Sequence, residues 1–258
     1  MMSRTEFAYA QVRIQARHGQ LPDALRWRQL EASRTAGQLV AQWRAGPWAD
    51  WVDALDELGD VHHIERQLRS RWRAYVDEVA GWLPSRWQGA IHWFGTLVDL
   101  PLIDAVQRDA HAERWLRRDP RLAAFSEQAP AARQQSLRAA GLLALERQGE
   151  RDGASEQGDG LSDWLDEWTR RLPPDASDPA LLRRPAELLW PGLSERGSLR
   201  GLGVESVWHS LLRLFRRHAT GAVAVFAHLA LVWLMAERLR GGLVVRALFE
   251  TRPAPVPH

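Results

Sequence analysis

Apolar residues recur every three or four positions through long stretches of the chain, which is the period of an α-helix. The clearest stripe consists of Ile64, Leu68, Trp72, Tyr75, Val76, Val79, Trp82 and Leu83. Pro84 lacks the backbone N–H that a helix interior requires, so one helix is predicted from Asp60 to Pro84.

Further helices are predicted from similar patterns. A second stripe runs from Trp87 to Val98, a shorter one from Ser33 to Trp43, and good helix formers fill Ala131 to Gln148. Two Asp-Gly pairs lie in the polar stretch 149–160, but no strand pattern flanks them, so this stretch is predicted to be a loop. The predicted fold class is all-α.

One segment near the carboxyl end, His218 to Ala236, contains no Asp, Glu or Arg in nineteen residues. That length is close to what a membrane-spanning helix requires. The central His228, the Thr220-Gly221 pair near the start and many alanines favour a helix buried in a helical protein. Arginines flank both ends, so charge gives no orientation across a membrane. We expect a buried helix, with a single membrane span as the alternative.

Composition excludes several classes of protein. The 258 residues include 14 Trp and no Cys, which removes disulfides, thiol nucleophiles and cysteine-based metal sites. All 34 basic residues are Arg, and 32 acidic residues nearly balance them. The apolar fraction of 45% is typical of a globular protein and excludes wholesale disorder. Residues 1–17 contain no apolar core, so no signal peptide is expected.

Charge alternates in blocks along the chain. Residues 1–48 carry seven Arg and three acids, 49–60 carry five acids and no base, 150–178 carry nine acids and three Arg, and 179–258 carry eleven Arg and five acids. This pattern suits a helical protein joined by ion pairs, or one with two surfaces of opposite sign. A groove for nucleic acid would be basic throughout, so nucleic acid is not an expected partner.

Candidate catalytic and metal-binding residues are few. His62 and Glu65 share a helix face and could bind one metal ion, but no second such pair supplies the remaining ligands, so a capping and surface role is favoured. Gly197 to Gly203 has neither the glycine spacing nor the lysine of a phosphate-binding loop. Asp163, Asp166 and Glu167 are typical of a solvated acidic face. We therefore assign no catalytic, cofactor-binding or metal-ligating residue, and expect neither an enzyme nor a small-molecule substrate.

The tryptophans favour a protein that binds other proteins. Trp72, Trp82, Trp93 and Trp233 lie in apolar stripes and are predicted to fill the core. Trp43, Trp48 and Trp51 lie beside the acidic block and are predicted to be exposed, because Trp and Arg dominate contact energies at protein interfaces. The alternative is that these three also fill the core. Ala49 to Asp53 is similar to Ser162 to Asp166, which could mark two copies of one helical unit.

The two ends of the chain carry motifs of a known family. The opening run is Phe7-Ala8-Tyr9-Ala10-Gln11-Val12-Arg13-Ile14-Gln15-Ala16-Arg17, followed by Gly19 and Leu21. The closing motifs are Trp208-His209-Ser210-Leu211-Leu212-Arg213 before the apolar helix and Glu237-Arg238-Leu239-Arg240, Leu243, Arg246 and Leu248-Phe249 within and after it. Together they resemble the C subunit of bacterial and archaeal V/A-type rotary ATPases, a relative of the eukaryotic V-ATPase d subunit. The resemblance covers roughly residues 6–105 and 193–249. Gly241-Gly242 is expected to interrupt the last helix.

The resemblance implies a lobed, funnel-like protein built of related helical units. The lobes would be residues 1–105, a shortened middle region 106–192 and residues 193–250, followed by a flexible tail, 251–258. Such a subunit lies at the cytoplasmic side of the membrane as a peripheral protein, contacts the proteolipid ring and the central shaft, and couples them during proton or sodium transport without an active site or cofactor. The alternatives are an unrelated helical scaffold and a single-span membrane protein.

Overall fold

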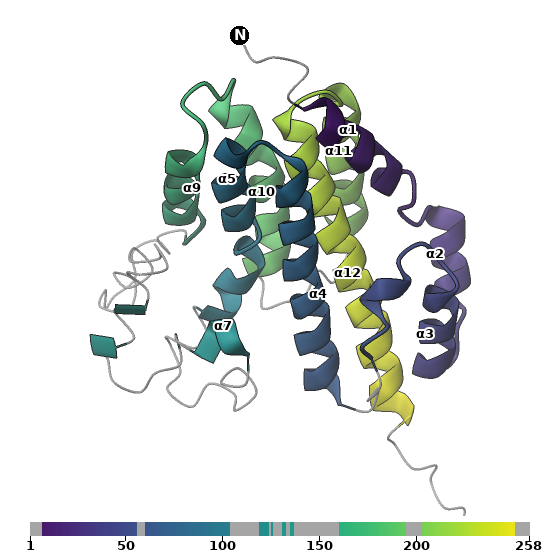
Figure 1. Ribbon diagram of the computed structural model, residues 1–258. Coiled ribbons are helices and arrows are strands. Elements are labelled where there is room, and N and C mark those ends of the chain that lie inside the picture. Colours follow the sequence, from purple (N-terminus) through teal and green to yellow (C-terminus); the bar gives the residue numbers. More distant parts are fainter. Residues whose placement is uncertain are drawn as a thin grey trace, which may run out of the picture.

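The computed structural model describes residues 7–55, 60–103, 119–123, 125, 131–132, 135–136, 160–194 and 203–250. Throughout these ranges the regular secondary structure is helical, without a β-strand, so the predicted all-α fold is confirmed (Figure 1). In chain order the elements are α1 (Ala8–His18), α2 (Ala24–Glu31), α3 (Ala36–Arg44), η1 (Ala49–Trp51), α4 (Val61–Trp82), α5 (Ser85–Phe94), η2 (Leu97–Asp99), α7 (Pro120–Ala123), α9 (Gly160–Arg171), α10 (Pro179–Ser194), α11 (Gly203–Arg217) and α12 (Ala222–Glu250).

Short polar side chains begin several of the helices. Asp23, Thr35 and Asp60 each accept a hydrogen bond from a backbone N–H in the first turn of α2, α3 and α4. Such a cap stabilises a helix by about 1 kcal/mol. α4 ends at Trp82 and Pro84 precedes the first residue of α5, so the helix predicted between Asp60 and Pro84 is confirmed.

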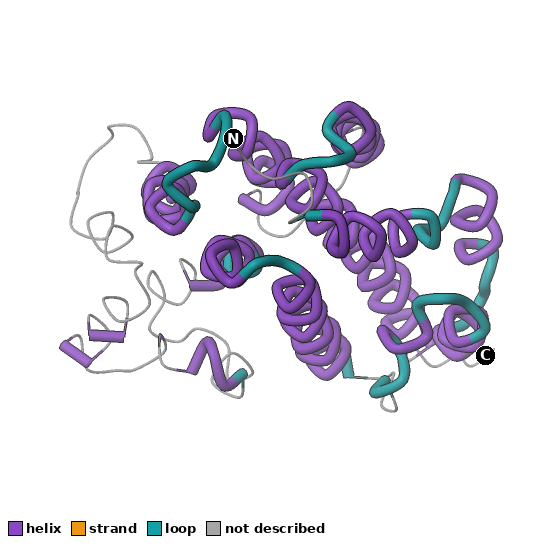
Figure 2. The backbone as a smooth tube through the Cα atoms, turned by 45° about the horizontal axis from the view of Figure 1, so that its top comes forward, coloured by secondary structure: helices purple, strands orange, loops and turns teal. Residues whose placement is uncertain are grey.

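The longest helix, α12, is the centre of the fold. It packs against α1, α3, α4, α10 and α11. Figures 1 and 2 show it crossing the molecule, with α4 beside it and α2 and α3 near its carboxyl-terminal half. Every residue from Ala222 to Ala236 is buried. Length and composition alone would let Ala222–Phe249 cross a membrane, but 89% of its most apolar stretch is covered by the rest of the chain, as in the core helix of a soluble protein.

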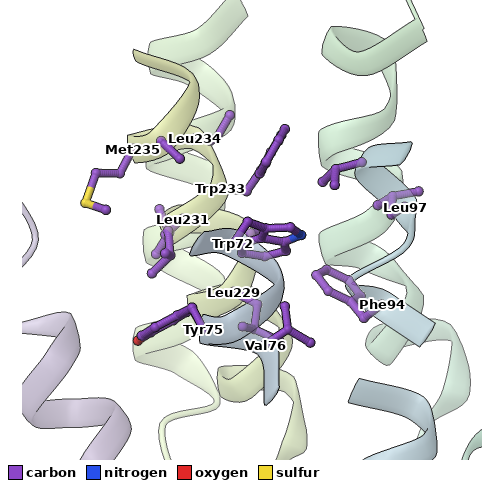
Figure 3. Close-up of a cluster of buried hydrophobic side chains, with 14 of the residues drawn as sticks. Trp72, Tyr75, Val76, Phe94, Leu97, Leu229, Leu231, Trp233, Leu234 and Met235 are labelled. Carbon is purple, nitrogen blue, oxygen red and sulfur yellow. The ribbon is translucent and has the colours of Figure 1, made fainter. Parts of the chain in front are cut away.

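Aromatic side chains join α12 to the helices around it. Trp72 of α4 meets Trp233 of α12 edge to face, with ring centroids 5.3 Å apart, and its Nε1 donates a hydrogen bond to the carbonyl oxygen of Gly95. Phe226 lies 5.2 Å from Phe94 of α5, centroid to centroid. Figure 3 shows Trp72 and Trp233 in contact, with Phe94 on the neighbouring segment. The four tryptophans predicted to fill the core are all buried: Trp72, Trp82, Trp93 and Trp233.

The prediction that Trp43, Trp48 and Trp51 are exposed is wrong. Their residues are only 3%, 2% and 2% exposed. The connection between α3 and α4 folds back over α4, so the rings of Trp48 and Trp51 pack 5.6 and 6.2 Å from the ring of Tyr75. Trp43 packs against Trp27 of α2. The three side chains fill the core, whereas the nearby Asp50 and Asp53 are exposed at the surface.

Two expectations about the last helix also fail. Residues 218–220 form a turn after α11, so the helix begins at Ala222 and not at His218. Gly241-Gly242 does not interrupt α12, which continues to Glu250. A Cβ atom at Gly242 would lie only 3.2 Å from Leu39 Cδ2, so the missing side chain lets α3 approach α12 closely.

The two similar tryptophan segments do not share a conformation. Ala49–Trp51 forms the 3-10 turn η1, whereas Ser162 to Asp166 lies inside the α-helix α9. The likeness is therefore limited to the burial of one tryptophan in each, Trp51 and Trp164.

Several predicted features lie mainly outside the described residues. These are the helix over 131–148, the loop over 149–160, the tail 251–258 and the lobe boundary near 105, whereas the boundary predicted near 192 falls inside α10. The division into lobes therefore stays a prediction.

Phe226 offers a direct test of the packing around α12. Truncating it in the variant Phe226→Ala is expected to lower the free energy of unfolding by about 3–5 kcal/mol, because the ring is fully buried among Trp87, Phe94 and Trp168. Val12→Ala serves as the control, since Val12 is 71% exposed and should change stability by less than about 0.5 kcal/mol. Urea unfolding followed by circular dichroism measures both, and equal stabilities would contradict the packing.

Candidate functional site

A buried ion network joins α4 and α12 just beyond the uncharged part of α12. Arg69 lies at its centre and donates hydrogen bonds from Nε to Glu65 Oε1 at 2.6 Å and from Nη1 to Asp99 Oδ1 at 2.9 Å. Arg240 of α12 completes it, with Nη2 2.8 Å from Glu237 Oε2 and Nε 3.4 Å from Glu65 Oε2. The side chains of Arg69 and Asp99 are 8% and 5% exposed. We call Glu65, Arg69, Asp99, Glu237 and Arg240 the ion network.

The ion network continues through Arg73, one turn further along α4. Its Nη2 lies 2.9 Å from Asp119 Oδ2 and 3.5 Å from Asp99 Oδ1. Asp119 is 2% exposed and immediately precedes α7. One chain of alternating charges thus fastens α4 to η2, to the start of α7 and to α12.

Neighbouring opposite charges keep Glu65 and Arg69 ionised although both are buried. Burial alone would raise the pKa of Glu65, but Arg69 and Arg240 outweigh it and hold that pKa below its ordinary value. Burial opposes the charge of Arg69 as well, yet Glu65 and Asp99 raise its pKa above the ordinary value. A general acid or base needs a pKa near the working pH. Glu65 and Arg69 therefore stay charged, and their ion pairs hold the helices together.

A second buried polar group lies nearer the amino-terminal end of α12. Tyr75 Oη is 2.7 Å from His228 Nε2, and the ring of His18 lies 6.1 Å from that of His228. Burial lowers the pKa of His228 to about 3 and that of His18 to about 4, the latter aided by the charge of Arg216. Burial also raises the pKa of Tyr75. All three are neutral at pH 7, and the tautomer of His228 decides which of Tyr75 Oη and His228 Nε2 donates the hydrogen bond.

A small apolar groove lies where α2 and α3 meet the carboxyl-terminal half of α12. Its volume is about 270 Å³. Its lining residues are Trp27, Leu30, Glu31, Leu39, Arg238, Leu239, Gly241, Gly242, Val245 and Arg246. Arg238 stacks over Trp27 at 4.4 Å and pairs with Glu31, while Arg246 donates to the carbonyl oxygens of Ser33 and Glu31. The polar groups around the groove are thus occupied within the chain.

The residues singled out in the sequence do not converge. His62 is exposed at the start of α4, but Glu65 belongs to the ion network, so the surface role predicted for Glu65 is wrong. Arg69 and Arg240 draw it inward, and Asp60, not His62, caps α4. Of the segment 197–203, only Gly203 lies among the described residues, and it begins α11.

Two of the three acidic residues of α9 pair with arginines. Asp166 lies 3.5 Å from Arg183, and Glu167 lies 2.8 Å from Arg171. Asp163 and Asp166 are exposed, as expected of a solvated acidic face. Within the described ranges, no three His, Asp or Glu side chains gather closely enough to hold a metal ion.

Comparisons with known proteins leave function to be inferred from the chain itself. No protein-family model, no curated protein and no solved structure matches it.

Sequence reasoning missed the ion network, although part of its signal was present. Glu65, Arg69 and Arg73 follow one another at intervals of four and therefore share a helix face. Arg69 adjoins Leu68 of the apolar stripe, which marks that face as partly buried. The partners Asp99 and Asp119 are about 30 and 50 residues away, and local spacing cannot connect them.

Removing one charge of the ion network should destabilise the protein strongly. In Asp99→Asn the shape is kept, but Arg69 and Arg73 lose a buried counter-charge, which is expected to lower the free energy of unfolding by about 3–5 kcal/mol. The matched control Asp53→Asn removes an exposed carboxylate 3.8 Å from Arg44 and should change it by less than about 1 kcal/mol. Urea titration compares the two variants, and equal losses would refute a special role for the network.

The buried histidines predict a pH dependence of stability with a definite sign. Their pKa values are lower in the folded state than the ordinary 6.5, so the unfolded chain binds more protons below that pH. The stability that the neutral histidines provide is therefore fully present above pH 6.5. It falls as the pH decreases, by about 1.4 kcal/mol per pH unit for each fully buried histidine. Between pH 6.5 and 5, His228→Leu should show a slope smaller by about that amount.

Urea unfolding at a series of pH values measures this slope. His92→Leu is the matched control, because it removes a histidine that is about half exposed on α5. Parallel curves for His228→Leu and the unaltered chain would show that His228 is not held neutral.

Proposed function

We propose that this chain is a non-catalytic coupling subunit of a V/A-type rotary ATPase. In this role it would lie at the cytoplasmic side of the membrane as a peripheral protein. It would contact the proteolipid ring and the central shaft and transmit torque between them during proton or sodium transport. The lobed, funnel-like shape of that family belongs to the same proposal.

The observation that carries the proposal is the contact between the two ends of the chain that resemble the family. Gln11 of the opening run donates a hydrogen bond from Nε2 to the carbonyl oxygen of Gly221, 210 residues away. α1 also packs against both α12 and α4. The opening and closing motifs thus form one unit, as expected if a common function retained them together.

The contacts of the closing motif also support the proposal. Glu237 and Arg240 form an ion pair one turn apart, and Arg240 reaches Glu65 of α4. Arg238 reaches Glu31 of α2. The Arg240–Glu65 and Arg238–Glu31 pairs join α12 to α4 and α2, and a torque-transmitting subunit would need such contacts to resist local opening.

Isolation from native membranes tests the proposed assembly. The affinity-tagged full chain, expressed in the organism that produces it and solubilised in mild detergent, should bring down proteolipid and shaft subunits in stoichiometric amounts. An equally tagged unrelated helical protein is the control. Isolation of the chain without any ATPase subunit would contradict the proposal and favour an unrelated scaffold.

Loss of the chain should separate pumping from catalysis. In inverted membrane vesicles from a deletion strain, ATP-driven ion uptake is expected to vanish while the ATPase head still hydrolyses ATP, because only the mechanical link is missing. Restoring the gene should restore uptake. Equal loss of hydrolysis and uptake, or loss of neither, would contradict a coupling role.

A further inference from the structure

One surface of the molecule is formed by described segments that themselves contain no acidic residue. It consists of the outer face of α1, the last two turns of α11 and the turn over 218–221. No Asp or Glu occurs in residues 7–22 or in residues 206–236. We call this surface the basic end.

Direct contacts hold the parts of the basic end together. Gln11 and Gln15 of α1 donate hydrogen bonds to the carbonyl oxygens of Gly221 and Ala219. His18 stacks on Phe215 of α11 with ring centroids 3.7 Å apart. α1 therefore lies against the end of α11, and the charges of both helices act on the same region of solvent.

The arginines of the basic end face solvent. Arg13, Arg213, Arg216 and Arg217 are exposed. Arg13 lies over the rings of Tyr9 and Trp82, and Arg213 donates to the Ser210 hydroxyl. Within the described part of the chain, none of the four pairs with a carboxylate, whereas Arg17 of α1 lies 3.3 Å from Glu78 of α4.

An exposed apolar stripe accompanies these charges. Tyr9 and Val12 are 56% and 71% exposed, and Ala16 continues the stripe one turn further along α1. Val12 and Arg13 follow Tyr9 by three and four residues, and Arg13 lies over the Tyr9 ring, so aromatic, aliphatic and cationic side chains are neighbours on α1. Helices that lie in a membrane interface combine apolar and basic side chains in this way, and tyrosine is enriched at that depth.

We propose that the basic end binds the surface of a membrane rich in anionic lipids. Arg213, Arg216 and Arg217 would meet lipid phosphates, while Tyr9 and Val12 would enter the headgroup region. An acidic protein partner is the alternative occupant, and it predicts no binding to protein-free vesicles. The peripheral position proposed above requires nearness to a membrane but no direct lipid contact. Lipid binding by the purified chain needs no ATPase subunit, so its failure is distinguishable from failure of the coupling role.

Vesicle sedimentation with the purified full chain tests the proposal. The chain should bind vesicles of phosphatidylcholine with 30% phosphatidylglycerol at low salt, and should bind vesicles of phosphatidylcholine alone much more weakly. In Arg216→Ala/Arg217→Ala the partition coefficient is expected to fall about 25-fold, roughly five-fold for each arginine near a charged bilayer.

Matched variants separate the basic end from general charge. Arg28→Ala/Arg34→Ala removes two exposed arginines from α2 and from the turn after it, and should bind like the unaltered chain. Val12→Asp should lower partitioning roughly ten-fold. Leu25→Asp alters an equally apolar residue, 57% exposed on α2, and should have little effect.

Three results would overturn the proposal. They are equal binding to neutral and anionic vesicles, equal loss in the two double-arginine variants, and no binding to anionic vesicles at low salt. Circular dichroism and urea unfolding establish that each variant is folded before its binding is compared.

Discussion

From Ala222 to Ala236 the chain forms a helix without a single charged side chain, and this helix has to be removed from water. Burying one large aliphatic or aromatic side chain contributes about 1.5–3 kcal/mol, and this segment carries many of them. Because its side chains point in all directions around the axis, no single neighbour can cover it. Helices α1, α4, α10 and α11 surround this part, and α3 covers its continuation. Their arrangement follows from the need to enclose α12.

Charged side chains first appear on α12 at Glu237, directly after its uncharged segment. Glu237 and Arg240 lie close to Glu65 and Arg69 of α4 and form the ion network with them. Arginine suits such sites because its planar guanidinium can bind carboxylates and stack on rings at the same time. Arg69 does both, pairing with Glu65 and lying over Trp233 at 5.7 Å. This double use gives a physical reason why a chain without lysine is also rich in tryptophan.

Local signals in the sequence were sufficient for the helices but not for the surfaces between them. The stripe from Ile64 to Leu83 and the proline after it determine α4 closely, because period and termination depend on neighbouring residues alone. Trp48 and Trp51 were misjudged because their burial depends on Tyr75, which the fold brings to them from more than twenty residues away. The ion network escaped prediction for the same reason. Its members are charged, and only the tertiary structure distinguishes a buried ion pair from a solvated one.

The proposed role is consistent with this construction. In that role the helices packed around α12 and the ion network would supply the stiffness that force transmission requires. The exposed side chains that are unused inside the fold, including those of the basic end, are then available for partners.

Thiol labelling tests most directly whether α12 is enclosed. The chain contains no Cys, so a single cysteine reports on one position. Val232→Cys places it where the residue is fully buried, and Ala16→Cys places it on exposed α1. In the native full chain, the cysteine at 232 is predicted to react only through opening of the structure, orders of magnitude more slowly than the one at 16. Equal rates at both positions would contradict the enclosed helix and the account built upon it.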